Sequence, residues 1–404
     1  MGTYSSLDIG RFEIDWGKND YYFDHRAIFQ ETDRKKVTCY YANNATEIKY
    51  AYTKKLGLIK DRLDLLGYSI ENLKKEYDKI IATRYELKGF MPFDKLFSFV
   101  KSIDINELVE KGIDWKKIEN DSVGMLKITY GLGYLIDHAP FSKYLPKYFR
   151  KKNFDEDAYR HLPIYLLLRL LAENADNHDL DVVWRIGDVI DSGWITWNDV
   201  KPKVEDNKRI WIVTEGSSDT KILQKAITAI KPHVADIFKY IDMQDNYPFT
   251  GTGQLTNFYK GLIKIYVLNK MLFIFDNDTE GIVKFRELSA IKNKPNNLLL
   301  CHLPSLDAFN NFPTIGATGE QSFNINGMAV SIECFLDLNF GDSKPMVQWG
   351  GYNEKAKQYQ GSLMHKDSYA REFTIKNIKS GEYDLSKIGT LLEYLFTQII
   401  TSCI

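Results

Sequence analysis

The sequence predicts two halves, a mostly α-helical N-terminal domain and then an α/β domain built on a parallel sheet. Two observations predict the second half: the apolar runs 209–214 and 271–275 each end in acidic residues, and each is followed by a helical pattern. Continuous apolar runs of this length are typical of strands buried on both faces. The third observation concerns the first half, where apolar residues between 46 and 66 recur at helical spacings of three and four.

The N-terminal half, residues 1–200, begins with an alternating stretch at 12–16 that predicts a short strand. The pattern then becomes helical, and a charged segment at 201–208 marks the linker to the second domain. The predicted helices of this half are 46–66, 69–81, 92–102, 107–110, 124–136, 163–174 and 180–190.

The composition indicates an ordinary folded protein, with 44% hydrophobic and 26% charged residues in 404. A formal net charge of −1 gives no overall basic field, so a nucleic-acid site would have to come from a local patch or from metal ions. The four cysteines form no CxxC pair, which indicates neither zinc nor a disulfide framework and fits a reducing cytoplasm. No signal peptide or membrane span is recognisable, and we expect a cytoplasmic protein.

The acidic residues that follow the two apolar runs suggest a metal site. Asp276 and Asp278 are two residues apart, so in extended backbone they point to the same side, and Glu215 follows the other run. If the two strands are parallel neighbours, the three carboxylates meet at the carboxyl edge of the sheet. Carboxylates so close together repel each other unless a cation lies between them, and Mg²⁺ or Mn²⁺ prefers such oxygens.

These motifs resemble the Toprim domain of topoisomerases, primases, the small ribonuclease M5 and OLD-type nucleases. The resemblance rests on Glu215-Gly216 after one strand, on Asp276-Asn277-Asp278-Thr279-Glu280-Gly281 after another, and on the turn Gly251-Thr252-Gly253 between them. It implies a Toprim domain at 209–340, followed by a C-terminal extension at 341–404.

The first 200 residues resemble the N-terminal domain associated with HEPN and Toprim proteins of bacterial conflict systems. This resemblance rests on 1–24, 55–77 and 169–174. HEPN ribonucleases carry an Arg with a His four to six residues later, and Arg169 and His178 are too widely spaced to match. The resemblance therefore implies a docking or dimerising domain, through which a protein partner or a second copy binds, with Glu173, His178 and Arg185 as structural residues.

Two further acids are candidates for binding metal. The spacing from Glu215 to Asp219 resembles that of OLD-type nucleases, and Glu333 lies in a short apolar helix at the place where Toprim nucleases carry a Glu. Asp219 could instead cap its helix, and Glu333 could be an ion-pair partner. Glu280 matches the topoisomerase-type motif or is a helix N-terminal acid.

The segment after residue 340 interleaves lysines with aromatic residues, a pattern that suits a phosphate backbone and unstacked bases, although a solvated surface has the same pattern. Lys357 and Lys366 are candidates to neutralise charge in a transition state, and Lys366 is preferred. The last helix is expected at 385–400.

Together these features predict a metal-dependent endonuclease that hydrolyses phosphodiester bonds in DNA or RNA with two Mg²⁺ or Mn²⁺ ions. The predicted catalytic residues are Glu215, Asp276, Asp278, Glu333 and Lys366, and the predicted metal ligands are Glu215, Asp219, Asp276, Asp278 and Glu333. By resemblance, its context is anti-phage defence as a toxin-like effector. The alternative is a non-catalytic Toprim-fold regulator that binds nucleic acid or a partner without cutting.

Overall fold

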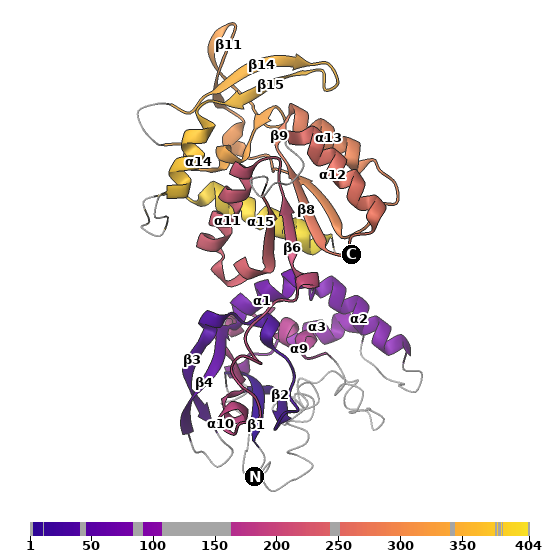
Figure 1. The fold of residues 1–404 in the computed structure, drawn as a ribbon, viewed down its shortest axis with the longest axis vertical. Coiled ribbons are helices and arrows are strands. Elements are labelled where there is room, and N and C mark those ends of the chain that lie inside the picture. The colour runs from indigo at the N-terminus through magenta and orange to yellow at the C-terminus, as the bar shows by residue number, and fades with distance from the viewer. Residues whose placement is uncertain are drawn as a thin grey trace. The chain divides into compact units, whose positions relative to one another are not determined.

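The computed structural model describes residues 3–10, 12–40, 46–83, 92–106, 163–242, 251–339, 344–375, 378, 381 and 383–402. The chain divides into two compact units, one up to Val204 and the other from Glu205 (Figure 1). The division falls inside the segment 201–208, and each unit is described on its own.

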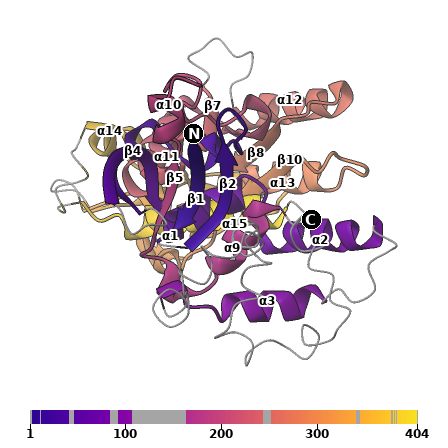
Figure 2. The ribbon, with the colours of Figure 1, turned by 90° about the horizontal axis from the view of Figure 1, so that it is seen from below.

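The first unit is organised around an antiparallel sheet of five strands in the order β2-β1-β5-β4-β3. Strands β4, β5, β1 and β2 lie side by side in Figure 2. Trp184 of the central strand is almost fully buried and packs against Tyr52 and Phe29. The strands are β1 (Tyr4–Ile9), β2 (Phe12–Lys18), β3 (Arg34–Tyr40), β4 (Thr46–Lys55) and β5 (Asp181–Arg185).

Helices pack on this sheet and share one apolar core with it. The expectation of a mostly helical domain is therefore wrong, because the described N-terminal residues are rich in strands. The expected short strand at 12–16 and the expected helices at 69–81, 92–102 and 163–174 are present. The helices are α1 (Leu56–Leu65), α2 (Ile70–Thr83), α3 (Phe93–Lys101), α9 (Ile164–Leu171) and α10 (Gly187–Asp191), and the 3₁₀ turns are Arg26–Ile28, Glu31–Asp33 and Ala175–Asn177.

Two of the N-terminal segments that were predicted to be helices form strands over part of their length. Residues 46–55 form β4, and the helix begins only at Leu56. Ile48, Tyr52 and Leu56 are spaced four residues apart. This spacing places side chains on one face of a helix and also on one face of a strand, so it could not distinguish the two structures. Residues 180–190 form β5 and the short α10. The helices predicted at 107–110 and 124–136 lie outside the described residues.

The second unit contains the predicted parallel sheet, with four strands in the order β10-β8-β6-β7, all parallel. Helices α12 and α13 cover the face that carries Met271, Phe273 and Phe275. Figure 1 shows α11 on the other side of the sheet, where it packs against α14 and α15. The elements are β6 (Ile210–Val213), α11 (Ser217–Ile230), β7 (Phe238–Ile241), α12 (Gly251–Ile265), β8 (Lys270–Phe275), β9 (Asn277–Asp278), α13 (Thr279–Ser289) and β10 (Leu298–His302), with 3₁₀ turns at Asp206–Lys208 and Pro232–Ile237.

A second sheet of four strands, in the order β12-β11-β14-β15, joins residues on both sides of position 340. Strand β14 runs parallel to β11, and β15 contacts β13 and α13. The residues expected as a C-terminal extension therefore belong to the same compact unit. The elements are β11 (Phe312–Gly316), β12 (Gly319–Phe323), β13 (Ala329–Val330), β14 (Val347–Asn353), β15 (Gln358–Leu363), α14 (Lys366–Ile375) and α15 (Ser386–Thr401), with 3₁₀ turns at Asp307–Phe309 and η8 (Ile332–Phe335).

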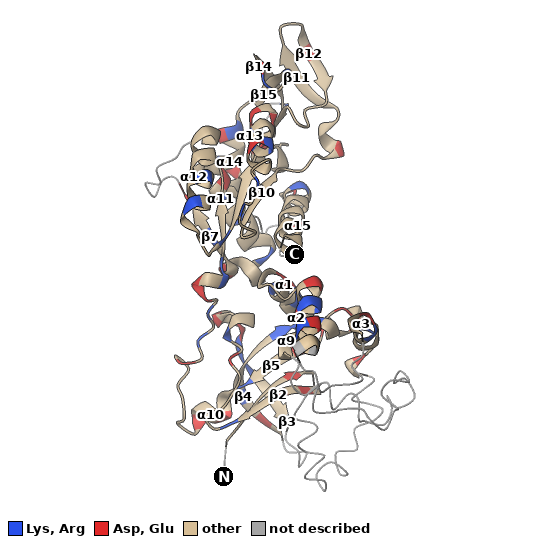
Figure 3. Ribbon diagram, turned by 90° about the vertical axis from the view of Figure 1, so that its right-hand side faces the viewer, with Lys and Arg blue, Asp and Glu red and all other residues tan. Residues whose placement is uncertain are grey.

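Both signs of charge are interspersed along the elements of each unit, for example on α2 and α13 (Figure 3). This distribution agrees with the formal net charge of −1. Any attraction for a polyanion must therefore arise from a few local residues.

Candidate active site

The first candidate carboxylate, Glu215, stands directly after strand β6. The hydroxyl of Thr214 donates a hydrogen bond to the carbonyl oxygen of Gly216 at 2.9 Å and lies 2.8 Å from the hydroxyl of Thr220. These contacts hold the turn between β6 and α11 closed. Glu215 therefore lies at the carboxyl edge of the parallel sheet, where α/β proteins place their sites.

Asp276 and Asp278 follow the neighbouring strand β8. One carboxylate oxygen of Asp278 accepts the backbone N–H of Gly281 at 2.7 Å, and the other accepts the side-chain amide of Gln360, also at 2.7 Å. The turn is tight, since a Cβ atom on Gly281 would lie 2.3 Å from the carbonyl oxygen of Asp276. Glycine at this position is what lets the chain turn at once from the strand into α13.

The two additional acids also face this edge. Asp219 accepts the backbone N–H of Gly216 at 3.2 Å, so it caps α11, the simpler of its two predicted roles. Glu333 in η8 is only 3% exposed. Its carboxylate accepts a hydrogen bond from the Ser331 hydroxyl at 2.7 Å and one from Ser218 at 3.5 Å, which joins η8 to the start of α11.

The carboxylates act on one another electrostatically. Burial and the charges of Asp278 and Asp219 raise the pKa of Glu215 to about 8. Burial and the charge of Glu333 raise the pKa of Asp219 to about 7. Asp276 lies among all of them, and burial, Asp219 and Glu215 raise its pKa well above the ordinary value. Burial also raises the pKa of Asp278. Such mutual repulsion is the condition under which a bound cation stabilises the folded chain most.

Lys366 supplies a positive charge beside this cluster from the first residue of α14. Partial burial alone would lower its pKa, but the carboxylates of Glu333 and Asp276 outweigh that effect, and the pKa lies above the ordinary value. The ammonium group therefore stays charged at neutral pH. The other residues predicted as catalytic or metal-binding therefore all lie within electrostatic range of Asp276.

The donor set fits a hard divalent cation in its chemistry. All five acids offer carboxylate oxygens, and Oε1 of Glu215 is buried without a hydrogen-bond partner among the described residues. An unsatisfied buried acceptor is costly unless something binds it. Within the described ranges, however, no group of three or more His, Cys, Asp or Glu side chains is arranged so that it could hold a metal ion.

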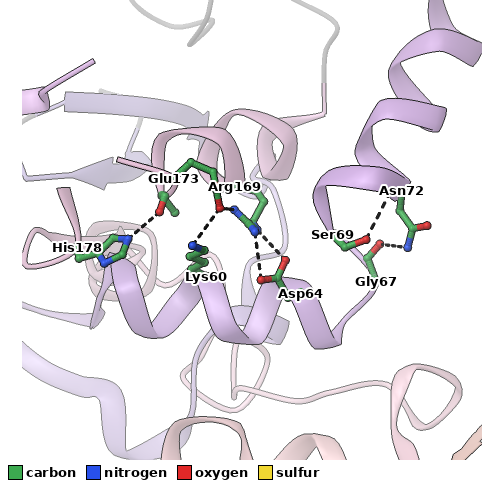
Figure 4. A network of polar contacts seen from close by, with 9 residues as sticks. Lys60, Asp64, Gly67, Ser69, Asn72, Arg169, Glu173 and His178 are labelled. Atoms are coloured by element: carbon green, nitrogen blue, oxygen red, sulfur yellow. Dashed lines mark hydrogen bonds and ion pairs between the residues drawn. The ribbon is translucent and has the colours of Figure 1, made fainter. Parts of the chain in front are cut away.

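In the first unit, the residues nearest to a HEPN-like pattern are tied into a polar network (Figure 4). The Arg169 guanidinium donates to both oxygens of Asp64, at 2.7 and 3.2 Å, and to Glu173 at 2.5 Å. Lys60 also pairs with Glu173, at 3.0 Å. His178 donates from Nε2 to the carbonyl oxygen of Ala172 at 2.8 Å. Arg169 and His178 therefore hold helices and turns together and do not face a common site.

A family model described as HEPN/Toprim N-terminal domain 1 matches residues 1–208 of the 404. The chain belongs to this family. A search of curated proteins and a search of solved structures each give no significant match. The family match covers the strand-rich first unit, and the carboxylate cluster lies outside it. Among the described helices of this HEPN/Toprim N-terminal domain protein, none has both the length and the apolar character of a membrane-spanning segment.

Two other predicted candidates lie at the margin of the cluster in this family member. Glu280 is exposed, and its carboxylate accepts the Thr252 hydroxyl at 2.6 Å. Lys357 is exposed in the turn between β14 and β15, where its φ is +55°. Of the two lysines considered, only Lys366 is among the charges that act on Asp219 and Asp278.

Three polar residues that hold the acids in place were not predicted. Gln360 binds Asp278, and Ser331 and Ser218 bind Glu333. Gln360 is 82 residues away from its partner, so no local pattern could have linked them. Ser331 is only two residues before Glu333, and a hydroxyl so close to a candidate ligand was the one available indication.

Proposed function

We propose that the chain is a metal-dependent nuclease with a Toprim-type site, which hydrolyses phosphodiester bonds in DNA or RNA. One observation carries the proposal: five acids with one lysine gather at the carboxyl edge of a parallel sheet, and four of the acids have raised pKa values. A purely structural cluster would gain nothing from such repulsion. Perturbed carboxylates at a sheet edge are instead typical of sites that bind a cation.

The proposed cofactor is Mg²⁺ or Mn²⁺, with two ions as the working assumption. Glu215, Asp276 and Asp278 would hold one ion, and Asp219 and Glu333 would extend the set to a second. When bound, such ions polarise the phosphate and lower the pKa of an attacking water.

The other side chains prepare this reaction. Lys366 can neutralise the charge that develops on the phosphate oxygens in the transition state. Gln360 keeps the Asp278 carboxylate in one orientation, and Ser331 does the same for Glu333. Positioning contacts of this kind typically change metal affinity or activity by about 10–100-fold.

The proposed biological setting rests on the resemblance of the N-terminal half to domains of bacterial conflict proteins. We propose an effector in anti-phage defence, acting in the cytoplasm as a toxin-like nuclease, with a protein partner or second copy bound through the N-terminal unit. The competing function is a regulator whose Toprim-type fold binds nucleic acid or a partner without cutting it. The raised pKa values favour the nuclease, because a binding module has no need of mutually repelling acids.

The deciding experiment is cleavage of duplex DNA, plasmid, total transfer RNA and single strands with Mg²⁺, with Mn²⁺ or with EDTA. Asp276→Ala is tested beside Glu320→Ala, which removes an exposed acid on β12 outside the cluster. We expect cleavage that requires metal, disappears in Asp276→Ala and persists in Glu320→Ala. If no substrate is cut, Mn²⁺ binding to wild type and not to Asp276→Ala would indicate a nuclease that awaits its partner. Absence of both cleavage and binding would favour the regulator.

A further inference from the structure

A cavity of about 290 Å³ lies beside the candidate active site, between α13, the end of β10 and the start of β15. Asn277, the residue between the two catalytic aspartates, lines it, whereas Asp276 and Asp278 do not. Alternate residues of an extended segment point to opposite sides, so the same short strand serves the carboxylate cluster on one side and this cavity on the other.

The cavity wall is rich in hydrogen-bond donors and contains no acid. The residues that line it include Arg286 and His302 together with several amide and hydroxyl side chains, and no Asp or Glu. The whole chain has 54 acidic and 53 basic residues, so a polar cavity lined by a basic residue and by no acidic one differs from the balanced charge of the chain as a whole. Such a lining favours an anionic ligand.

The amides of the wall are fixed by their own hydrogen bonds. Asn277 is 2% exposed and donates to the Ser305 hydroxyl at 3.1 Å. Gln358 donates to the carbonyl oxygen of Gly327 at 2.8 Å and to the Thr279 hydroxyl at 3.2 Å. These contacts make the wall rigid, so the cavity keeps its shape without a ligand.

One charged group remains for a ligand. It is not His302, because its Nδ1 donates to the carbonyl oxygen of Leu303 at 2.8 Å and the other nitrogen of a neutral ring can only accept a hydrogen bond. The Phe285 ring packs edge-on against the imidazole at 4.9 Å and fixes its direction. Arg286 is exposed, and within the described residues no hydrogen bond or ion pair engages its guanidinium.

We propose that this cavity binds a phosphate group of a nucleotide, held by the Arg286 guanidinium. Guanidinium groups suit phosphate because they donate two parallel hydrogen bonds. This inference rests on the proposed function in one respect: a strand whose scissile phosphate faces the carboxylates would place a neighbouring phosphate here. A free nucleotide offers the same chemistry and is the other possible source.

Exposed aromatic residues on the β14–β15 hairpin, which supplies Gln358 to the cavity wall, favour a strand as the source. Tyr352 and Tyr359 are 46% and 56% exposed, and their rings pack edge-to-face with 5.2 Å between the ring centroids. They are directly paired across β14 and β15, and Tyr359 follows Gln358, so its ring lies on the opposite face of β15 from the cavity. Paired exposed rings on a hairpin that borders a phosphate site suit the stacking of unpaired bases.

The test measures binding without cleavage, in EDTA, with the full chain. A fluorescent single-stranded oligonucleotide and adenosine monophosphate are titrated into wild type, Arg286→Gln and the matched control Lys284→Gln. Lys284 lies on the same helix, does not line the cavity and pairs with Glu287. We expect Arg286→Gln to bind the oligonucleotide about 10-fold more weakly and to lower the slope of log affinity against log salt by about 1, and Lys284→Gln to bind like wild type.

Each outcome decides between the two sources. Weaker oligonucleotide binding supports a strand phosphate, and weaker binding of the monophosphate alone supports a free nucleotide. Unchanged binding of both ligands by Arg286→Gln would overturn the proposal. Because Arg286 is exposed, the variant is expected to fold, which its thermal unfolding verifies. Arg286-dependent binding with neither metal-dependent cleavage nor Mn²⁺ binding would refute the nuclease and retain the phosphate site, so the two failures are distinguishable.

Discussion

The side-chain amide of Gln360 donates a 2.7 Å hydrogen bond to Asp278, and its carbonyl oxygen accepts the backbone N–H of Glu280 at 3.0 Å. Gln360, from the second sheet, therefore binds both the Asp278 carboxylate and the first turn of α13. With the Gly281 amide on its other oxygen, the Asp278 carboxylate has little freedom to rotate.

Replacing Gln360 tests this contact. We expect Gln360→Ala to lower kcat for metal-dependent cleavage by about 10–100-fold, because the carboxylate would lose its orientation. Gln348→Ala, on the neighbouring strand and exposed, is the control and should cleave like wild type. Equal activity of the two variants would show that the orientation of Asp278 does not depend on Gln360.

The stability of the metal-free protein should depend on pH. The pKa values of Glu215 and Asp219 are raised from ordinary values of 4.5 and 3.8 to about 8 and 7. The folded state therefore binds protons more tightly than the unfolded state, and stability falls as pH rises from about 4 to about 8. Thermal unfolding in EDTA from pH 4 to pH 8 measures this, and added Mg²⁺ or Mn²⁺ should restore the loss at pH 8.

Removing one charge of the cluster should have the same effect as protonation. We expect Asp276→Asn to raise Tm at pH 8 in EDTA and to abolish cleavage. Each kcal/mol of added stability should raise Tm by roughly 2–4 °C. Glu320→Gln, outside the cluster, should leave Tm unchanged. A Tm for Asp276→Asn below that of wild type at pH 8 would contradict the repulsion inferred for this carboxylate.

Replacing Gly281, the glycine after the aspartates, tests how closely the backbones of β8 and α13 approach each other. A Cβ at position 281 would lie 2.3 Å from the carbonyl oxygen of Asp276, so Gly281→Ala must push β8 and α13 apart. We expect a loss of about 1–3 kcal/mol and strongly reduced cleavage. Gly261→Ala on α12 is the control, because nothing lies within 4 Å of its added Cβ and alanine favours helix. Similar unfolding curves for both variants would refute the close approach.

The buried pair Arg169–Asp64 should matter for stability and not for catalysis. Both side chains are largely buried, so Arg169→Ala leaves a buried carboxylate without its partner and should cost about 3–5 kcal/mol. Lys60→Ala, which removes a more exposed member of the network, should cost less than about 1 kcal/mol. If Arg169→Ala instead kept its stability and lost nuclease activity, a catalytic role for this residue would have to be considered.

The parallel sheet could be predicted because its information is local. The strands around 209–214 and 271–275 are continuous apolar runs that end in Glu215 and Asp276, and the structure has strands there with the predicted parallel pairing. The last helix was predicted at 385–400 and spans Ser386–Thr401. Short-range hydrophobic patterns and their polar ends are sufficient for elements of this kind.

The N-terminal sheet could not be predicted in this way. Its strand β4 has consecutive buried residues, Ala51 to Lys54, so its burial does not alternate as an exposed strand would. Its central strand β5 was assigned to a helix, although Val182 and Trp184 alternate as buried residues. Pairing partners distant in sequence, rather than local propensity, decide the structure of such strands.

The central position of β5 in the sheet has a consequence for how the first unit folds while the chain is being synthesised. Strands β1 and β4 do not pair with each other, and β5 separates them although it is the last of the five in sequence. A growing chain that has not reached residue 181 therefore presents two open strand edges, which are templates for pairing with other chains. We therefore expect N-terminal fragments that end before residue 181 to aggregate unless a chaperone keeps them soluble.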